Sequence, residues 1–451
     1  MTTLIDQSPV PVAEPDAPSS PKLLAYATGS VGMGVWVTVP GLLLLYFLTD
    51  VLAVTPWIAG LALLLPKALD VIVHPWFGAV SDRQRRRYGH RRHMMWIGLF
   101  LTVALVGMFS VPASLSGLGA AVWVGVFYIF GNLLFASFQV PYLTTPSDLN
   151  VSYYQRTRVM TYRMVVLTVG LLGAGVAAPA LVRSGERGDY TTMAMLLSIV
   201  MLISGVVAII GIKRLGAWMP ETVEGTYHPG FKEGVSVALR DRQFRMLVLS
   251  YLFTGTVTHL FMAGVPYYAR YVFDNVGLTA AFMGAFLAPA ILASPVWLRV
   301  SKRIGKQRGL LISQSMFIAG SLLLAVGPML GLALTILIVA TLGVAFAGLQ
   351  LFAFSMVPDV VRSASADGSK AASYTGVWTA TEATGTAIGP YVYSAVLAIG
   401  GFAASAAGQD VVQSGSAMTA LVIGFTVVPA VLMVIAMTFQ RRYTLDATVR
   451  H

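Results

Sequence analysis

Runs of about 20 predominantly apolar residues recur along the whole chain, and this recurrence restricts the possible folds more than any other feature. Each run is long enough to cross the ~30 Å hydrocarbon core of a bilayer as an α-helix. Charged residues make up 11% of the chain, less than half of the roughly 25% that soluble domains carry. The runs do not alternate apolar and polar residues as transmembrane β-strands do. The sequence therefore predicts an all-α, multi-pass membrane protein.

Twelve spans are expected, and the positions of Lys and Arg test that number. They lie near 24–49, 56–80, 94–112, 119–145, 159–182, 191–212, 246–270, 277–300, 309–330, 333–357, 372–399 and 417–439. With twelve spans, 25 of the 30 Lys and Arg share one side with both termini, and only Arg183, Arg187 and Arg270 face the other. Because basic residues concentrate in cytoplasmic loops, we expect a plasma (inner) membrane protein with both termini cytoplasmic. The net charge of +11 then follows the loops, and nucleic acid is not an expected partner.

The loop at 213–245 is the longest and divides the chain into two six-span halves, 22–212 and 246–440. Residues 1–21, rich in Pro, Ser and acid, are expected to form a disordered cytoplasmic tail, and 441–451 a second tail. Each half carries a basic loop after its second span, VSDRQRRRYGHRR from Val80 and VSKRIGKQR from Val300. This correspondence favours a duplicated unit, as in many secondary transporters.

Span 2 places three ionisable residues, Lys67, Asp70 and His74, within an apolar stretch. Spacings of three and four put them on one face of a helix. Asp70 lies eleven residues from Ser81 at the cytoplasmic end, or ~16 Å at 1.5 Å per residue, close to the membrane midplane. A bare charge there costs roughly 2.5–3.5 kcal/mol, so such residues face a cavity or a partner. A solute or ion site is the first interpretation, and a Lys67–Asp70 pair that only locks helices together is the alternative.

Four other polar residues lie at similar depth in spans of both halves, and we expect them to converge on a central cavity. They are Gln139, Arg163, His259 and Glu382. His259 and Gln139 can equally be read as structural groups hydrogen-bonded to a neighbouring helix. Glu382 needs a cation, a proton or a solute to offset its burial.

The end of span 2 carries Gly78, Asp82 and Arg83 in the pattern G-x-x-x-D-R, followed by Gly89 and further arginines. The arginines anchor the topology. The pattern also predicts a conformational role, because Asp82 among arginines can form an inter-helix charge network that breaks when the two halves rock.

Span 2 and its loop resemble the glycoside–pentoside–hexuronide:cation symporter family (melibiose permease-like) of the major facilitator superfamily (MFS). The family pattern D-x-x-x-D-P-x-x-G-x-x-x-D-R is matched at Asp70, Pro75, Gly78, Asp82 and Arg83. Further resemblances extend over nearly the whole chain: VPYLTTPSDL at 140–149, QRTRVMTYR at 155–163, SMVPDVV at 355–361 and YTGVWTATEATGTAIG at 374–389. The resemblance implies the MFS fold of twelve helices in two six-helix halves, with Arg163 on a family arginine.

The departures from the family pattern fall on the residues that would bind solute and cation. The second acid of span 2 is His74, the acid of span 4 is Gln139, the acid of span 1 is Gly34, and the span 11 lysine is Ala383 beside Glu382. The family's cation site implies paired carboxylates, of which Asp70 alone remains. An imidazole replaces a hard oxygen ligand poorly, and histidine titrates near neutral pH. Proton coupling is therefore favoured over sodium, with the carrier open among Asp70, His74 and Glu382.

The sequence thus predicts a secondary active transporter that moves a small solute, a sugar or glycoside, by alternating access. The alternative within transport is an MFS carrier or exporter of a non-sugar amphipathic or drug-like metabolite, coupled or uncoupled. An enzyme is disfavoured because the chain has no cysteine and no G-x-x-x-x-G-K-[ST], H-E-x-x-H or G-x-S-x-G motif. A sensor is disfavoured because the loops are too short for an added domain. No cofactor or metal site is predicted, and a monomer is expected.

Overall fold

The computed structural model describes residues 18–149, 153–182, 185–215, 236, 238–364, 371–409 and 411–445. Within these ranges every regular element is a helix, and an isolated β-bridge pairs Leu52 with Ala406. Most of the expected tail 1–21, most of the expected linker 213–245 and the end of the expected tail 441–451 lie outside the described residues.

The first part of the chain makes six passages from one end of the molecule to the other. Their helices are α1 Ser20–Ala27, α2 Gly29–Val39, η1 Pro40–Leu44 and η2 Phe47–Val51 in the first passage, then α3 Pro56–Tyr88, α4 Arg92–Gly98 with α5 Leu101–Phe109, α6 Gly117–Asp148, α7 Tyr153–Leu181 and α8 Arg187–Arg214. The first passage contains π-helical turns that begin at Pro40 and Phe47. Proline lacks the N–H that a regular helix would use, so a change of helical register at Pro40 is expected.

The second part repeats this arrangement. Its helices are α10 Arg242–Tyr267 with η3 Tyr268–Val272, α11 Leu278–Ile304, α12 Lys306–Leu323 with η4 Leu324–Val326 and α13 Gly327–Leu330, α14 Leu332–Ala364, α15 Ala371–Ile399 and α16 Gly415–Arg441. Each of the twelve expected spans overlaps one of these passages. The helix ends follow local chemistry: Gly89 ends α3 with a left-handed φ of 68°, and Asp241 caps α10 by accepting from the N–H groups of Gln243 and Phe244.

Ten helical passages among the described residues are long and apolar enough to cross a membrane. The two expected spans outside that set are α3 and α15. They have 33 and 29 residues, more than the ~20 that a span requires. Both carry charged side chains well inside the helix, Lys67 and Asp70 in α3 and Glu382 in α15.

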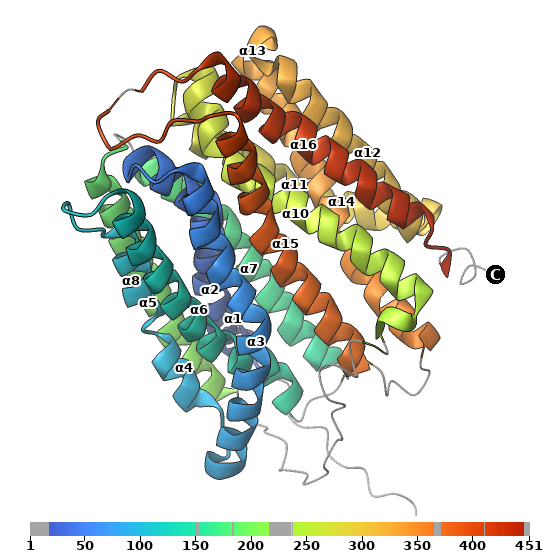
Figure 1. Cartoon of the computed structure of the whole chain (residues 1–451). Helices are drawn as coiled ribbons and strands as arrows, with labels where there is room; N and C mark the ends of the chain where they lie inside the picture. Colours follow the sequence, from blue (N-terminus) through green and yellow to red (C-terminus); the bar gives the residue numbers. More distant parts are fainter. Residues whose placement is uncertain are drawn as a thin grey trace, which may run out of the picture.

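The helices gather into two bundles that meet along three helix pairs. Figure 1 shows α1 to α8 on one side and α10 to α16 on the other. Where they meet, α3 packs against α15, α7 against α11, and η1 against α10. Helix backbones approach closely where glycine removes the side chain. A Cβ at Gly34 of α2 would lie 2.8 Å from the backbone of Gly170 and Leu171 in α7, and one at Gly389 of α15 would lie 2.6 Å from the backbone N of Leu260 in α10.

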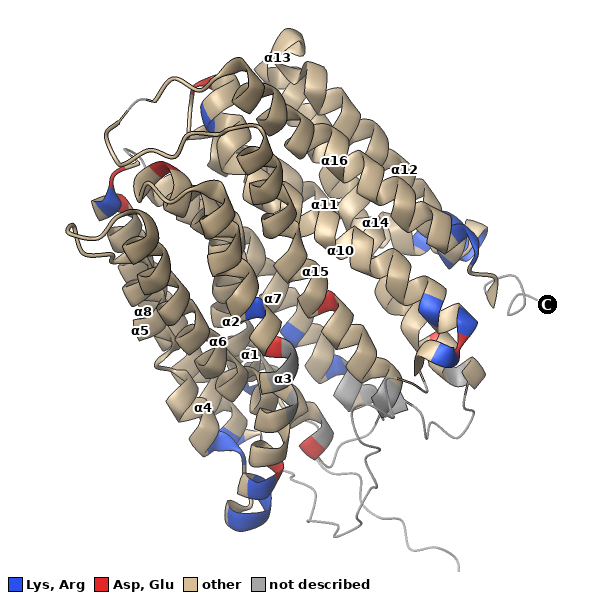
Figure 2. Ribbon diagram, in the orientation of Figure 1, with Lys and Arg blue, Asp and Glu red and all other residues tan. Residues whose placement is uncertain are grey.

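Lys and Arg gather at one end of the molecule, as Figure 2 shows. This end, called here the basic end, holds the C-terminal turns of α3, α8 and α11 and the N-terminal turn of α10. The opposite end, called the Asp50 end, holds the junction between η2 and α3. Few charged side chains lie between the two ends (Figure 2).

Candidate functional site

Lys67 and Asp70 of α3 form a buried ion pair near the middle of the molecule. Lys67 Nζ lies 3.2 Å from Asp70 Oδ2, and the two side chains are 13% and 6% exposed. The same ammonium lies 5.6 Å from the ring centroid of Tyr128 in α6. The cation is therefore held between a carboxylate and an aromatic face, two environments that favour its charged form.

Asp70 keeps one oxygen free. Its Oδ1 is buried and has no hydrogen-bond partner among the described residues. Buried polar atoms are nearly always hydrogen-bonded, so an unpaired one calls for a ligand, a proton or a water. The ion pair of the structural interpretation is thus present, but it does not use all of the carboxylate.

His74, one turn further along α3, bridges to α6. Its Nδ1 lies 2.9 Å from the backbone oxygen of Asp70, and its Nε2 lies 3.0 Å from Gln139 Oε1. A carbonyl oxygen only accepts, so Nδ1 carries the proton. Nε2 then donates to Gln139 Oε1 if the ring is doubly protonated, or accepts from the amide nitrogen if the ring is neutral and the amide is turned over. The pair can keep its hydrogen bond in both protonation states.

The candidate residues of the second bundle lie on α10 and α15. His259 Nδ1 donates to the backbone oxygen of Gly255, 2.9 Å away, and its Nε2 lies 3.3 Å from the hydroxyl of Thr386 on α15. The backbone oxygen of Glu382, 3.0 Å from Thr386 Oγ1, is a second acceptor for the one hydroxyl proton of Thr386. His259 therefore has a partner at both ring nitrogens and ties α10 to α15 near Glu382, whose side chain is half-buried.

Arg163 of α7 does not join Asp70. It makes no ion pair among the described residues, and its Nε is buried without a hydrogen-bond partner. Of these two cations, Lys67 alone pairs with Asp70 in the described part of the chain. Lys67 reaches Asp70 from the same helix, three residues away, whereas Arg163 projects from another helix.

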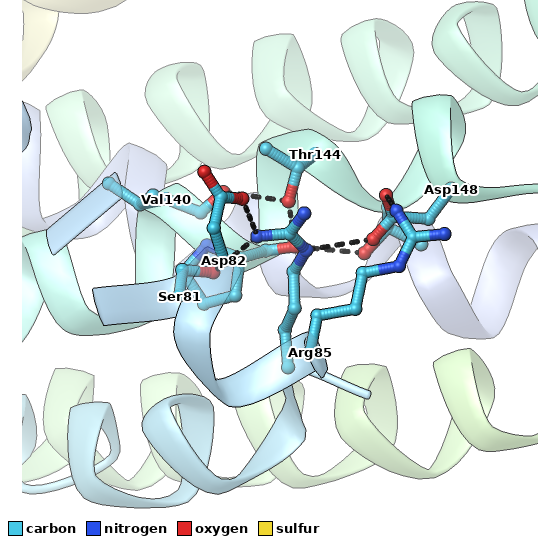
Figure 3. Close-up of polar contacts among 9 residues, drawn as sticks. Ser81, Asp82, Arg85, Val140, Thr144 and Asp148 are labelled. Atoms are coloured by element: carbon cyan, nitrogen blue, oxygen red, sulfur yellow. Dashed lines mark hydrogen bonds and ion pairs between the residues drawn. The ribbon is translucent and has the colours of Figure 1, made fainter. Parts of the chain in front are cut away.

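At the basic end, Asp82 joins a charge network that ties α3 to α6. Arg91, in the loop before α4, donates to Asp82 Oδ1 at 2.5 Å, to Asp148 Oδ2 at 2.9 Å and to the hydroxyl of Ser81 at 3.0 Å. Arg85 also pairs with Asp148. Figure 3 shows Ser81, Asp82 and Arg85 facing Thr144 and Asp148. The network therefore fastens the end of α3 to the end of α6.

Of the three motif residues Gly78, Asp82 and Arg83, Asp82 alone joins the charge network among the described residues. Arg83 is exposed and makes no ion pair among the described residues, and no atom lies within 4 Å of a Cβ built at Gly78. The partner of Asp82 is Arg91, because the αL turn at Gly89 reverses the chain and returns Arg91 to the end of α3. An equivalent pair, Lys306 with Asp359, joins α12 to α14 in the second bundle.

A polar cluster at the Asp50 end was not predicted from the sequence. The hydroxyl of Tyr271, in η3, donates to Asp50 Oδ1 at 2.5 Å, and the hydroxyls of Thr49 and Tyr267 lie 2.6 Å apart. Two backbone hydrogen bonds join the same segments. The N–H of Ser405 donates to the oxygen of Thr49 (2.9 Å), and the N–H of Ala407 donates to the oxygen of Val51 (3.1 Å). We call this the Asp50 seam. Its one sequence signal is an aspartate directly after an apolar run, and it holds the two bundles together at this end.

Gly34, which stands where the family has an acid in span 1, does not face the candidate site. It packs against the backbone of Gly170 and Leu171. The close approach of α2 and α7 leaves no room for a side chain at Gly34. The absence of the family acid at this position is therefore matched by the way these two helices pack.

This arrangement agrees with a comparison of the chain with families of known proteins. Residues 25–447 match the model of the family described as MFS/sugar transport protein. The chain belongs to this family. It is a membrane transporter of the major facilitator superfamily and not an enzyme, and the resemblance predicted from the sequence motifs is confirmed.

The relatives that this MFS transporter matches are named for different solutes. The isoprimeverose transporter of Lactiplantibacillus pentosus is 25% identical over 417 residues, which cover 88% of this chain and 84% of that protein. The sodium-dependent lysophosphatidylcholine symporter 1-B of Danio rerio is 24% identical over 379 residues, 75% of this chain and 70% of that protein. The crystal structure of the nucleoside transporter NupG has a TM-score of 0.67 at 13% identity, covers 94% of this chain and 99% of its own, and shares the fold.

Proposed function

We propose that this MFS transporter moves a small sugar or glycoside across the plasma membrane by alternating access around the Asp70 region, with the basic end in the cytoplasm. The observation that carries the proposal is Asp70 itself: a buried carboxylate, inside a helix of a sugar-transport family member, with one oxygen left free. Hydroxyl groups of a sugar can donate to such an oxygen, and a coupling proton can bind it. The family match and the isoprimeverose relative support a sugar or glycoside as the solute.

A proton is the coupling cation that the local chemistry favours. Asp70 already has an ammonium partner in Lys67, and the two positions where the family carries further acids are His74 and Gln139, bonded to each other. A sodium ion would have to displace Lys67 and accept an imidazole nitrogen among its ligands, which is unfavourable for a hard cation. A proton can bind His74 without breaking its bond to Gln139, because the amide offers either an acceptor or a donor.

The second candidate is an amphipathic solute with a charged head group. The lysophosphatidylcholine symporter relative, matched over 75% of this chain, supports it. A thermal-shift screen of the purified protein against sugars, glycosides and lysophospholipids separates the two. Stabilisation by sugars or glycosides alone supports the first proposal, and stabilisation by lysophospholipids alone overturns it.

Proton coupling predicts a specific response to imposed gradients. In proteoliposomes at fixed membrane potential, the stabilising solute should accumulate under an inward proton gradient and only equilibrate under an inward sodium gradient. His74→Gln keeps a partner for Gln139 but cannot take up a proton, so it should equilibrate solute under both gradients. The exposed His93→Gln serves as the matched control. Accumulation driven by sodium alone would contradict the prediction, and equilibration of the wild type under both gradients would identify a uniporter.

The Asp82 network predicts an effect on rate rather than on affinity. Asp82 is 51% exposed, so removing its charge should change stability by less than about 1 kcal/mol. It should, however, loosen one of the bonds that hold the end of α3 to Arg91 and thereby to α6. We expect Asp82→Asn to slow solute uptake several-fold while the solute dissociation constant stays within twofold, and Asp82→Glu to retain most of the rate. A large loss of affinity at unchanged rate would exclude the conformational role.

A further inference from the structure

A cavity of about 120 Å³ lies at the basic end, beside the Asp82 network and apart from the Asp70 region. It is built entirely from the first bundle, where the turn after α3 meets α4, α6 and α8. The lining residues that matter here are Arg85, His90, Arg91, Arg92, Asp148 and Ile212. Charged side chains therefore reach the cavity from the turn and from the ends of α3, α4 and α6, and small or apolar groups complete its lining.

The charges around this cavity do not balance. Three arginines line it against one carboxylate, and Asp82 pairs with one of them, Arg91, so these five side chains carry a net charge of +1. Asp148 is shared by Arg85 and Arg91. Arg92 is half-buried and makes no ion pair among the described residues. Lys213 and Arg214 follow the lining residue Ile212 directly in the chain, which adds to the positive potential on this side.

His90 reports the same imbalance. Its Nδ1 is buried and has no hydrogen-bond partner in the described part of the chain. Burial lowers the pKa of His90, and the positive charges of Arg92 and His93 lower it further. With its proton on Nδ1, a neutral His90 offers one hydrogen-bond donor, and the neighbouring Arg92 has no ion pair within the described residues, so together they present a donor and a positive charge that an anion would satisfy.

The surface next to the cavity is apolar and exposed. Trp96, Ile97 and Phe100, which follow Arg92 along α4 and the turn after it, expose about half or more of their surface. In a membrane protein, such a surface faces lipid chains. A phospholipid with its head group in the cavity could therefore place its acyl chains against this apolar surface.

We propose that this cavity binds a phosphate group, supplied by the head group of an anionic phospholipid of the cytoplasmic leaflet. Guanidinium forks such as that of Arg92 bind phosphate oxygens through parallel charge-assisted hydrogen bonds. Basic pockets between transmembrane helices on the cytoplasmic side are suited to anionic head groups. Because Arg91 both lines the cavity and holds Asp82, the bound lipid contacts the residue on which the α3–α6 connection depends.

The test compares lipid binding by the purified protein and its variants in native mass spectrometry. The probes are phosphatidylglycerol, phosphatidylcholine with the same acyl chains, and inorganic phosphate. Wild-type protein should bind phosphatidylglycerol more tightly than phosphatidylcholine. Arg92→Gln should weaken phosphatidylglycerol binding about fivefold, the equivalent of about 1 kcal/mol for one basic residue. The phosphatidylglycerol affinity of Arg92→Lys should lie between those of the wild type and Arg92→Gln, because lysine keeps the positive charge but cannot form two parallel hydrogen bonds.

The matched control is Arg303→Gln, which removes an exposed arginine from the end of α11, in the corresponding basic loop of the second bundle. It should bind phosphatidylglycerol like the wild type. Equal weakening by Arg303→Gln and Arg92→Gln would overturn the site, because a diffuse basic surface would then be the cause. Equal affinity of the wild type for the two lipids would also overturn it, and this comparison does not depend on the folding of any variant. If inorganic phosphate competes fully and binds as tightly as the lipid, the source is free phosphate and the lipid assignment is wrong.

Discussion

Asp70→Asn should abolish accumulation of solute while the protein still folds and reaches the membrane. The substitution preserves the shape of the side chain but removes the charge that pairs with Lys67 at 3.2 Å and the acceptor oxygen that is free in the structure. Uptake into proteoliposomes under a proton gradient should fall to the level of protein-free vesicles. Size-exclusion chromatography should show the same monodisperse peak as the wild type.

The matched control is Asp274→Asn, at an exposed carboxylate that pairs with Arg270, four residues earlier in the chain. It should accumulate solute normally. An assay of solute counterflow then distinguishes two possible roles of Asp70, binding of the coupling cation and binding of the solute. Counterflow retained by Asp70→Asn assigns the carboxylate to the coupling cation, and counterflow lost assigns it to the solute. Normal accumulation by Asp70→Asn would remove this residue from the mechanism.

Gly34→Ala should destabilise the protein markedly although it adds only one methyl group. That carbon would lie 2.8 Å from the backbone of Gly170 and Leu171, and backbone atoms of a packed helix cannot move aside as a flexible side chain can. Overpacking of this kind costs about 1–3 kcal/mol. The expected result is a lower melting temperature and a lower yield of monodisperse protein, followed by differential scanning fluorimetry.

Gly41→Ala is the control for this prediction, since no atom lies within 4 Å of a Cβ built at Gly41 in η1 of the same passage. Its melting temperature should match or exceed that of the wild type. Gly34→Asp, which restores the acid of the family pattern, should be less stable still because it also buries a charge without a partner. A stable Gly34→Asp protein would show that α2 and α7 do not pack as closely as described.

The fold could be predicted from the sequence because the bilayer imposes a simple rule on it. Any stretch that crosses hydrocarbon must be helical and about 20 residues long, so the apolar runs locate the helices, and all twelve expected spans overlap helical passages. The relation of Lys67, Asp70 and His74 was predictable for a similar reason, because helical periodicity alone places residues three and four apart on one face.

Contacts between helices were harder to predict from the sequence, because they depend on the rotation of each helix about its axis and on the distance between helices. The bond between His74 and Gln139 joins residues 65 apart, and the bond between Asp50 and Tyr271 joins residues 221 apart. No periodicity relates such positions. The sequence places Asp82 among several arginines, and the turn at Gly89 decides that Arg91 is the one that returns to the helix end. Arg163 was placed near Asp70 by depth alone, which says nothing about the direction in which a side chain projects.

The burial of Asp50 in the Asp50 seam affects the free energy of separating the two bundles at this end. Asp50 is 8% exposed, and within the described residues it is held by hydroxyl groups and by no ion pair. A carboxylate in that position loses hydration that two hydroxyls replace only in part. In the proposed alternating access the bundles would separate at this end, and water would then reach the carboxylate and restore that hydration. This gain would offset part of the loss of the backbone bonds of Ser405 and Ala407. The carboxylate that helps to join the two bundles would thus also favour their separation.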